Sequence, residues 1–246
     1  MNEAQRITEW VEQKKESAIA LARAVWGFAE PNGRETQSAA AISAALEAEG
    51  FALERRPCGM ETAFVATWGG EGPVIAFLGE YDALPALSQQ AGRAEKAPLC
   101  EGAAGHGCGH NLHGSLSILK GLALKDLKDS YKGKLHVIGT PAEEENGAKI
   151  GMAAQGIFDN MSLAMMMHSW SGGKCRADMD ALSLQCYFVE FYGQAAHAVA
   201  APWEGKSALA AARKFLDLID ARRECFTPDV HVNSIILDGG KAPNII

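Results

Sequence analysis

The sequence predicts an α/β fold, with a mostly parallel β-sheet flanked by helices and a smaller α+β unit after it. Between about residues 73 and 168, near-continuous apolar stretches of strand length alternate with helical patterns, which is typical of a parallel sheet covered on both faces. With 246 residues and 48% hydrophobic content, the chain is long enough to bury a core. Near Leu182 the pattern changes to a long stretch of mixed polarity, where we expect the second unit to begin.

Two amphipathic helices open the chain. Apolar residues recur at helical spacing from Ile7 to Phe28, and Pro31-Asn32-Gly33 then break the pattern. A second helix is expected from about Ser38 to Glu49, with Thr36 as its cap and Gly50 as its stop.

The remaining elements alternate between strands and helices. We expect a first domain over residues 1–182 and a second over residues 183–246. In the first domain the predicted strands are 51–55, 63–68, 74–78, 134–140 and 162–168, and the predicted helices are 112–127 and 148–156. In the second, strands are predicted at 182–193 and 230–237, and a helix at 207–222.

The charge balance and the polar start of the chain argue against nucleic-acid and membrane partners. The chain has 23 basic and 30 acidic residues and no cluster of Lys and Arg, so a nucleic-acid partner is not expected. The first residues are polar, and no segment has the length of a membrane span, so we expect a cytoplasmic protein that does not contact membranes. The six cysteines are scattered, which indicates thiols in a reducing compartment.

Polar residues follow the predicted parallel strands. Asp82 comes after the strand at 74–78, the loop HGCGHNLHG opens the next helix, Glu143-Glu144-Glu145 follow KLHVIGT, and His168 ends AMMMH. Because the carboxyl ends of parallel strands meet at one edge of a sheet, these side chains are expected to lie together.

The residues in this group suit metal-dependent hydrolysis. A thiolate and an imidazole, here Cys108 and His110, bind zinc and similar divalent ions. They are two residues apart and can share an ion only on irregular backbone, which neighbouring glycines permit. Glu143 and Glu144 point in opposite directions if the backbone is extended, so one can ligate an ion while the other takes a proton from the attacking water. The sequence alone does not say which does which.

Other interpretations of these residues remain open. Cys108 could instead act as a nucleophile paired with His110, as in a cysteine amidase. His106 and His113 flank the ligands and are expected to support them or to cap the helix. His136 and His231 are expected to be ordinary core residues.

Six ordered motifs resemble a known family. They are PVIAFLGEYDALP, GHGCGHNLHG, GTPAEEENGAK, AMMMH, GQAAHAVAAPWEGKSAL and GGKAPNII, and together they span nearly the whole chain. They are similar to the metal-dependent aminoacylase, carboxypeptidase and amidohydrolase superfamily, and within it to the type of the aminobenzoyl-glutamate utilisation protein B and the N-acyl amino acid hydrolases. The resemblance implies a phosphorylase/hydrolase-like sheet of the zinc exopeptidase type with an inserted lid and dimerisation domain. Residues 1–182 would then be the N-terminal portion of the catalytic, metal-binding domain, and residues 183–246 the N-terminal half of the lid.

The resemblance also implies roles for single residues. Two divalent ions, Zn or Mn, would be held by Cys108, His110, Glu144 and His168. Glu143 matches the general base, and Asp82 matches the carboxylate near the metal site. His197 matches a lid histidine that stabilises the oxyanion, often across a homodimer interface, and Asn244 matches a residue that holds the substrate carboxylate.

Three features depart from the family pattern. Glu80 stands where members with an HxD motif have a ligating histidine, and Asn111 replaces an aspartate common after CGH. The chain ends at Ile246, before the lid is complete and before a final histidine ligand, so we expect a fragment or a truncated reading frame.

The predicted function is hydrolysis of the amide bond in an N-acyl or N-aroyl amino acid or a dipeptide-like small molecule, for example aminobenzoyl-glutamate, by metal-activated water. The alternative is an inactive fragment or a non-catalytic subunit that keeps part of the metal site.

Overall fold

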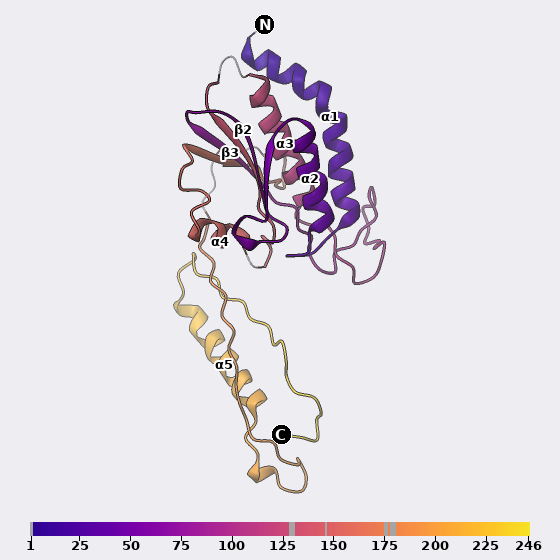
Figure 1. The fold of residues 1–246 in the computed structure, drawn as a ribbon. Helices are drawn as coiled ribbons and strands as arrows, with labels where there is room; N and C mark the ends of the chain where they lie inside the picture. Colours follow the sequence, from indigo (N-terminus) through magenta and orange to yellow (C-terminus); the bar gives the residue numbers. More distant parts are fainter. Residues whose placement is uncertain (1, 128–130, 146, 175–176, 178–180) are drawn as a thin grey trace. The chain divides into compact units, whose positions relative to one another are not determined.

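The computed structural model describes residues 2–127, 131–145, 147–174, 177 and 181–246 (Figure 1). The chain divides into two compact units, Met1–Lys174 and Cys175–Ile246, and each is described by itself. Among the described residues, no helix is both long and apolar enough to cross a membrane.

The first unit is built on a five-stranded sheet with the order β1-β2-β4-β3-β5. Strands β3, β4 and β5 run parallel, while β1 pairs antiparallel with β2 and β2 antiparallel with β4. The sheet is therefore mixed, with its parallel part where the near-continuous apolar strands predicted it. The strands are β1 Ala52–Arg55, β2 Phe64–Gly69, β3 Val74–Gly79, β4 Lys134–Gly139 and β5 Leu163–Met166.

Helices cover both faces of this sheet, which confirms the predicted α/β class. On one face the main core joins α1, α2 and α3 to the strands through buried residues such as Val25, Leu46 and Val137 (Figure 1). On the other face α4 contributes Met152, which packs with Val65 and Ile138. Each such side chain stabilises the fold by about 1.5–3 kcal/mol through removal from water. The helices are α1 Glu3–Phe28, α2 Thr36–Ala48, α3 His110–Asp126 and α4 Ala148–Ala154.

The start of α2 differs from the prediction. Thr36 was expected to cap this helix, but it is the first helical residue, and Glu35 occupies the cap position without a capping side-chain bond. The free N–H groups of Gln37 and Ser38 instead donate to the carboxylate of Glu30, each at 2.9 Å. The cap prediction was wrong because a residue several positions upstream folds back to supply the acceptor, which helix-start patterns do not anticipate.

The second unit contains the predicted helix and not the predicted strands. Helix α5 covers Ala208–Arg222, and the Ser207 hydroxyl oxygen caps it by accepting from the Ala210 N–H. The segments 182–193 and 230–237 are irregular, so the strand predictions there were wrong. Among the residues described in this unit, the only ladder contacts are isolated bridges at Gln194–Lys206 and His197–Ile245. A strand needs a neighbour for its backbone groups, and these segments have none within the described chain.

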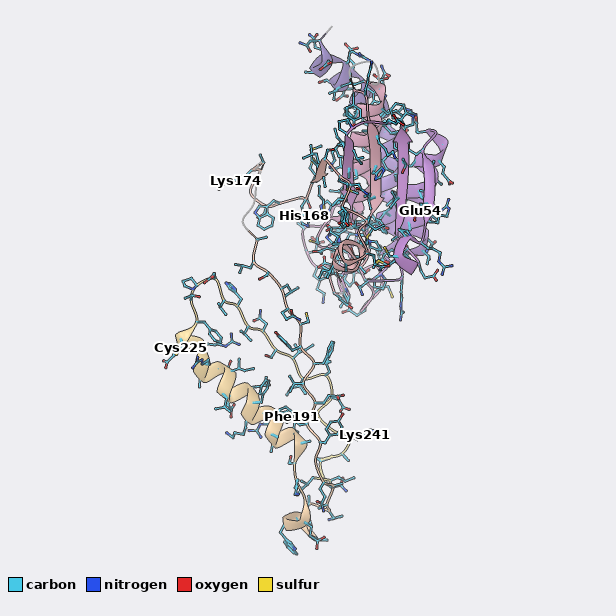
Figure 2. The ribbon with its side chains drawn as sticks, turned by 60° about the vertical axis from the view of Figure 1, so that its left-hand side comes forward. Glu54, His168, Lys174, Phe191, Cys225 and Lys241 are labelled. Atoms are coloured by element: carbon cyan, nitrogen blue, oxygen red, sulfur yellow. The ribbon has the colours of Figure 1, made fainter. Side chains whose placement is uncertain are left out.

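Helix α5 nonetheless packs against the irregular chain beside it. The Phe191 and Phe215 rings lie 5.8 Å apart between centroids, and Figure 2 shows Phe191 on the segment next to the helix. Short 3-10 turns complete the chain: η1 Pro57–Gly59, η2 Pro202–Glu204 and η3 Arg223–Cys225.

Candidate metal centre

The candidate site lies at the carboxyl ends of the parallel strands. Glu80 and Asp82 follow β3, and Glu143 and Glu144 follow β4. His168 follows β5, and Cys108 and His110 stand at the start of α3. The parallel arrangement of β3, β4 and β5 therefore delivers segments distant in sequence to one edge, as the sequence predicted.

Glycines make the loop before α3 possible. Gly109 has a positive φ of 82°, a left-handed conformation that favours glycine. A Cβ on Gly105 would lie 2.0 Å from the Leu87 carbonyl oxygen. The backbone carrying Cys108 can thus turn sharply into the helix and bring the thiol and His110 to the same space.

His110 is the centre of the group. Its ring is buried, and its Nδ1 lies 2.8 Å from Asp82 Oδ1, while Asp82 Oδ2 accepts the Glu144 N–H at 3.0 Å. A neutral His110 therefore carries its proton on Nδ1 and turns the lone pair of Nε2 the other way. That Nε2 faces carboxylate oxygens of Glu80 at 3.4 Å, Glu144 at 3.7 Å and Glu143 at 3.8 Å.

The structure brings all four predicted ligands into one neighbourhood. Ligand atoms of Cys108, His110 and Glu144 all lie within 4.8 Å of one another. The fourth, His168, joins through its Nε2, which lies 3.4 Å from the Cys108 Sγ. Its Nδ1 donates to the Ser169 carbonyl at 2.7 Å, which leaves the Nε2 lone pair directed at the thiol.

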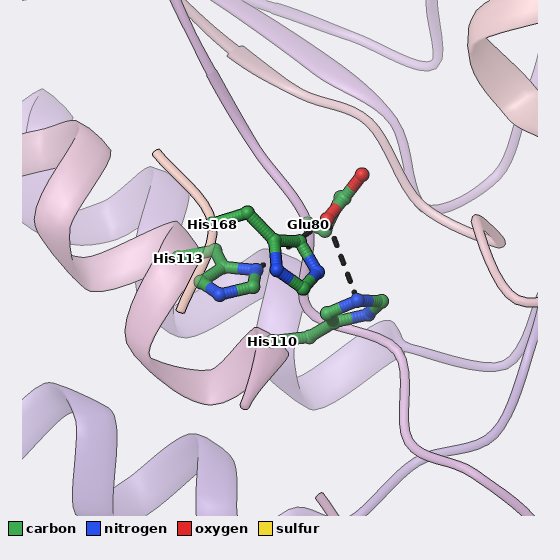
Figure 3. A group of neighbouring side chains, drawn as sticks. All are labelled: Glu80, His110, His113 and His168. Carbon is green, nitrogen blue, oxygen red and sulfur yellow. Dashed lines mark ion pairs between the residues drawn. The ribbon is translucent and has the colours of Figure 1, made fainter. Parts of the chain in front are cut away.

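A second, overlapping group lies beside the first. Glu80, His110, His113 and His168 also place one ligand atom each within 4.8 Å, and Figure 3 shows these four side chains converging. Glu80 was not among the predicted site residues. Its position two residues before Asp82, at the end of the same strand, was the available signal. His113 lies one turn along α3 from His110 and shares its face of the helix.

Buried atoms without partners mark the space between these side chains. Among the described residues, Glu80 Oε2, His110 Nε2, His113 Nδ1 and Glu144 Oε1 are buried and have no hydrogen-bond partner. Burying a polar atom without a partner costs about 1–3 kcal/mol in proteins. A cation bound to the lone pairs among them would offset this cost, and thiolate, imidazole and carboxylate donors suit Zn and similar ions. The residues present fit a metal centre.

The electrostatics of the group also fit a cation. Burial raises the pKa of Glu80, but contact with His113 and the charge of Lys149 outweigh burial and lower the pKa to about 2. Burial raises the pKa of Glu144. Burial and the charge of Glu144 raise the pKa of the Cys108 thiol to about 11. Without a cation this thiol stays protonated, which disfavours the cysteine-nucleophile interpretation.

The adjacent glutamates, Glu143 and Glu144, differ in exposure. The side chain of Glu143 is 40% exposed, whereas that of Glu144 is 17% exposed. The less exposed Glu144 belongs to the group with Cys108 and His110, while Glu143 turns toward solvent. This is the division expected if one carboxylate ligates an ion and the other exchanges protons with water.

His197 and Asn244 belong to the second unit. His197 Nδ1 accepts from the N–H groups of Val199 and Ala200, each at 3.2 Å. The Asn244 carbonyl accepts the Ala198 N–H at 3.0 Å, and His197 bridges Ile245. The two residues therefore lie near each other in the second unit. Their predicted contact with substrate stays a prediction.

Comparison with known proteins tests the resemblance. The family model described as Peptidase family M20/M25/M40 matches residues 76–228. A p-aminobenzoyl-glutamate hydrolase subunit of Escherichia coli K12 is 34% identical over 243 residues, covering 98% of this chain and 50% of that protein. The Xaa-Arg dipeptidase of Mus musculus is 33% identical over 255 residues, covering 98% and 55%.

The chain is also similar to a solved structure of the same family. A dinuclear metal binding peptidase of the M20 family from Bacillus subtilis aligns with a TM-score of 0.54 and 26% identity, over 65% of this chain and 44% of that one. The chain spans about half the length of the curated relatives it matches. With the family model matching more than half of its residues, the chain belongs to peptidase family M20/M25/M40.

Proposed function

We propose that the protein is a metal-dependent amidohydrolase that cleaves the amide bond of an N-acyl or N-aroyl amino acid or a dipeptide. Membership of the M20/M25/M40 family supports hydrolysis of such bonds. The names of two relatives give the substrate classes to try first, p-aminobenzoyl-glutamate and Xaa-Arg dipeptides. The observation that carries the proposal is the set of buried, unpartnered oxygen and nitrogen atoms around His110.

In this proposal Cys108, His110, Glu144 and His168 hold two divalent ions, Zn or Mn. The bound ions would polarise the amide carbonyl and lower the pKa of the attacking water. The Bacillus subtilis relative, a dinuclear metal binding peptidase, supports a count of two ions. Asp82 fixes the His110 ring through the 2.8 Å contact with its Nδ1, so that Nε2 stays available.

Glu143 is the general base of the proposed reaction. Its carboxylate lies beside the ligand group and keeps 40% of its side chain exposed, so water can reach it. It accepts a proton from the attacking water and then gives that proton to the nitrogen of the leaving amine. From the family resemblance, His197 would stabilise the oxyanion, Asn244 would bind the substrate carboxylate, and two copies of the chain would pair through the lid.

Substitution of Glu143 tests the proposal. Glu143→Gln keeps the size of the side chain but removes its basicity, so kcat should fall by about 10²–10⁴-fold while metal content stays the same. Glu145→Gln is the matched control, because Glu145 is exposed and belongs to neither ligand group. Hydrolysis of p-aminobenzoyl-glutamate, N-acyl amino acids and Xaa-Arg dipeptides should be measured with metal analysis by mass spectrometry. Full activity of Glu143→Gln would refute the assigned base, and hydrolysis unaffected by chelators would refute metal dependence.

A further inference from the structure

Ser169 follows His168 directly, and its backbone N–H and hydroxyl join this segment to the one that carries Cys108 and His113. Its backbone N–H donates to His113 Nε2 at 2.9 Å. Its hydroxyl donates to the Cys108 carbonyl oxygen at 3.1 Å, and the same oxygen lies 3.1 Å from His113 Nε2. Its own carbonyl accepts the Nδ1–H of His168 at 2.7 Å. One residue thus connects the loop before α3, the first turn of α3 and the end of β5.

The hydrogen bond from the Ser169 backbone N–H also fixes which ring nitrogen of His113 carries the proton. A backbone N–H can only donate, so His113 Nε2 must be the unprotonated nitrogen of the ring. The proton of the neutral ring then lies on Nδ1, which faces Glu80 Oε2 at 3.4 Å. Neither nitrogen keeps a free lone pair for a cation, although His113 lies within the second candidate group of ligand atoms.

We propose that Ser169 and His113 form a latch that positions the metal ligands, and that His113 is a positioning residue and not a ligand. The latch is the chain of contacts from the Cys108 carbonyl through Ser169 and His113 to Glu80. It sets the spacing of Cys108 Sγ and His168 Nε2, which lie 3.4 Å apart. On its far side, Glu80 is held by an ion pair with Lys149. This inference rests on the proposed metal-dependent function.

The tautomer of His113 can be measured directly. Nitrogen-15 NMR of the histidine rings in the metal-free protein should show His113 protonated on Nδ1 and unprotonated on Nε2. The same pattern should persist after Zn²⁺ is added, because His113 does not ligate. A proton on Nε2 in the metal-free protein, or loss of the Nδ1 proton on adding Zn²⁺, would overturn the assignment.

Metal affinity tests the latch itself. Ser169→Ala keeps the backbone N–H but removes the hydroxyl contacts with Cys108 and His113. Zn²⁺ affinity in a chelator competition should therefore fall by about 10–100-fold with the number of ions unchanged. With Co²⁺ as the probe, the thiolate-to-cobalt absorption band should shift. Ser169→Thr retains the hydroxyl and should bind like the unaltered protein. His113→Gln, which keeps an acceptor for the Ser169 N–H, should retain both ions.

Ser43→Ala is the matched control, because Ser43 is a buried serine that bonds within α2 and to Arg55, away from this site. It should leave affinity and spectrum unchanged. Unchanged Zn²⁺ affinity in Ser169→Ala would overturn the latch alone, and loss of one ion in His113→Gln would identify His113 as a ligand and also overturn it. Absence of metal binding in the unaltered protein would overturn the proposed function, and the latch with it.

Discussion

At the scale of single residues, two buried glutamates between α1 and α2 have pKa values that are shifted in opposite directions. Glu30 is 8% exposed, and burial raises its pKa, but bonds from the N–H groups of Gln37 and Ser38 outweigh burial and leave the pKa below its ordinary value of 4.5. Glu35 is fully buried, and for it burial outweighs the bonds it accepts, so its pKa is raised above 4.5. The two carboxylates should therefore give stability opposite dependences on pH.

Replacing Glu30 or Glu35 with glutamine should change the pH dependence of the free energy of unfolding in opposite directions. A lowered pKa means that Glu30 stabilises the fold above pH 4.5 and loses this contribution as the pH falls through its folded pKa. A raised pKa means that the contribution of Glu35 is present below pH 4.5 and is lost as the pH rises through its folded pKa. Unfolding in urea from about pH 3 to 7 measures both.

The expected magnitudes follow from hydrogen bonding. At about pH 7, Glu30→Gln should cost about 1–3 kcal/mol, because bonds to a charged acceptor become bonds to a neutral one. That cost should shrink toward pH 3. Relative to the unaltered protein, Glu35→Gln should gain stability as the pH rises. Parallel pH curves for the two variants would contradict the assignment of opposite shifts.

The sequence alone does not assign the separate roles of Glu143 and Glu144. Their adjacency predicts two directions and hence two roles, but not which residue takes which role. Backbone geometry supports the proposed assignment: the Glu144 N–H donates to Asp82 at 3.0 Å, and the Glu144 carboxylate lies 3.7 Å from His110 Nε2. That tie spans 62 residues of sequence and has no local signal.

At the scale of elements, the first turn of α3 depends on Gly109. Its φ of 82° is left-handed, and a Cβ there would lie 2.6 Å from the Ser169 hydroxyl oxygen. Gly109→Ala should therefore suffer both backbone strain of about 1–2 kcal/mol and a clash that pushes Ser169 away from Cys108. We expect lower stability and weaker Zn²⁺ binding in the same variant.

Gly92 offers the matched control for this prediction. It has a φ of 77°, and no atom of another described residue beyond its chain neighbours would lie within 4 Å of an added Cβ. Gly92→Ala should show the strain alone, with unchanged metal affinity. Thermal unfolding and a zinc competition assay on both variants separate the two effects. Equal losses of stability and equal zinc affinity in the two variants would show that the clash with Ser169 has no influence.

The elements themselves were predictable where the pattern is local. Apolar spacing placed α1, α3 and the parallel strands, because each buries one face or both faces against a neighbour. It failed for residues 182–193 and 230–237, whose residues suit a pleated strand but have no paired neighbour in the described chain. Strand pairing is non-local, so composition alone cannot supply it.

At the scale of the whole molecule, one topological rule predicted most of the candidate site. Parallel strands deliver their carboxyl ends to one edge, and this rule brought Asp82, Cys108, Glu144 and His168 together without any information on side chains. It could not assign Glu80 or His113, whose involvement follows from their contacts. It also says nothing about His197 and Asn244, whose proposed roles depend on a unit with its own fold.

The second unit exposes large apolar side chains. Among its described residues none is buried, and Tyr187, Phe188 and Tyr192 are at least 80% exposed. Burial of such side chains against a partner would remove apolar surface from water. Because the family resemblance implies pairing of lids, we predict that the protein forms a homodimer through this unit, and sedimentation across a range of protein concentrations should show a reversible monomer–dimer equilibrium.

Phe188→Asp tests which surface forms the dimer. If Phe188 is buried between copies, placing a charge there should weaken association by about 30-fold or more, since central aromatic contacts contribute about 2 kcal/mol or more. Leu99→Asp is the matched control, because Leu99 is 71% exposed in the first unit and the change in chemistry is similar. The dissociation constant of Leu99→Asp should equal that of the unaltered protein. Equal weakening in both variants, or a monomer at every concentration, would contradict a dimer built on the second unit.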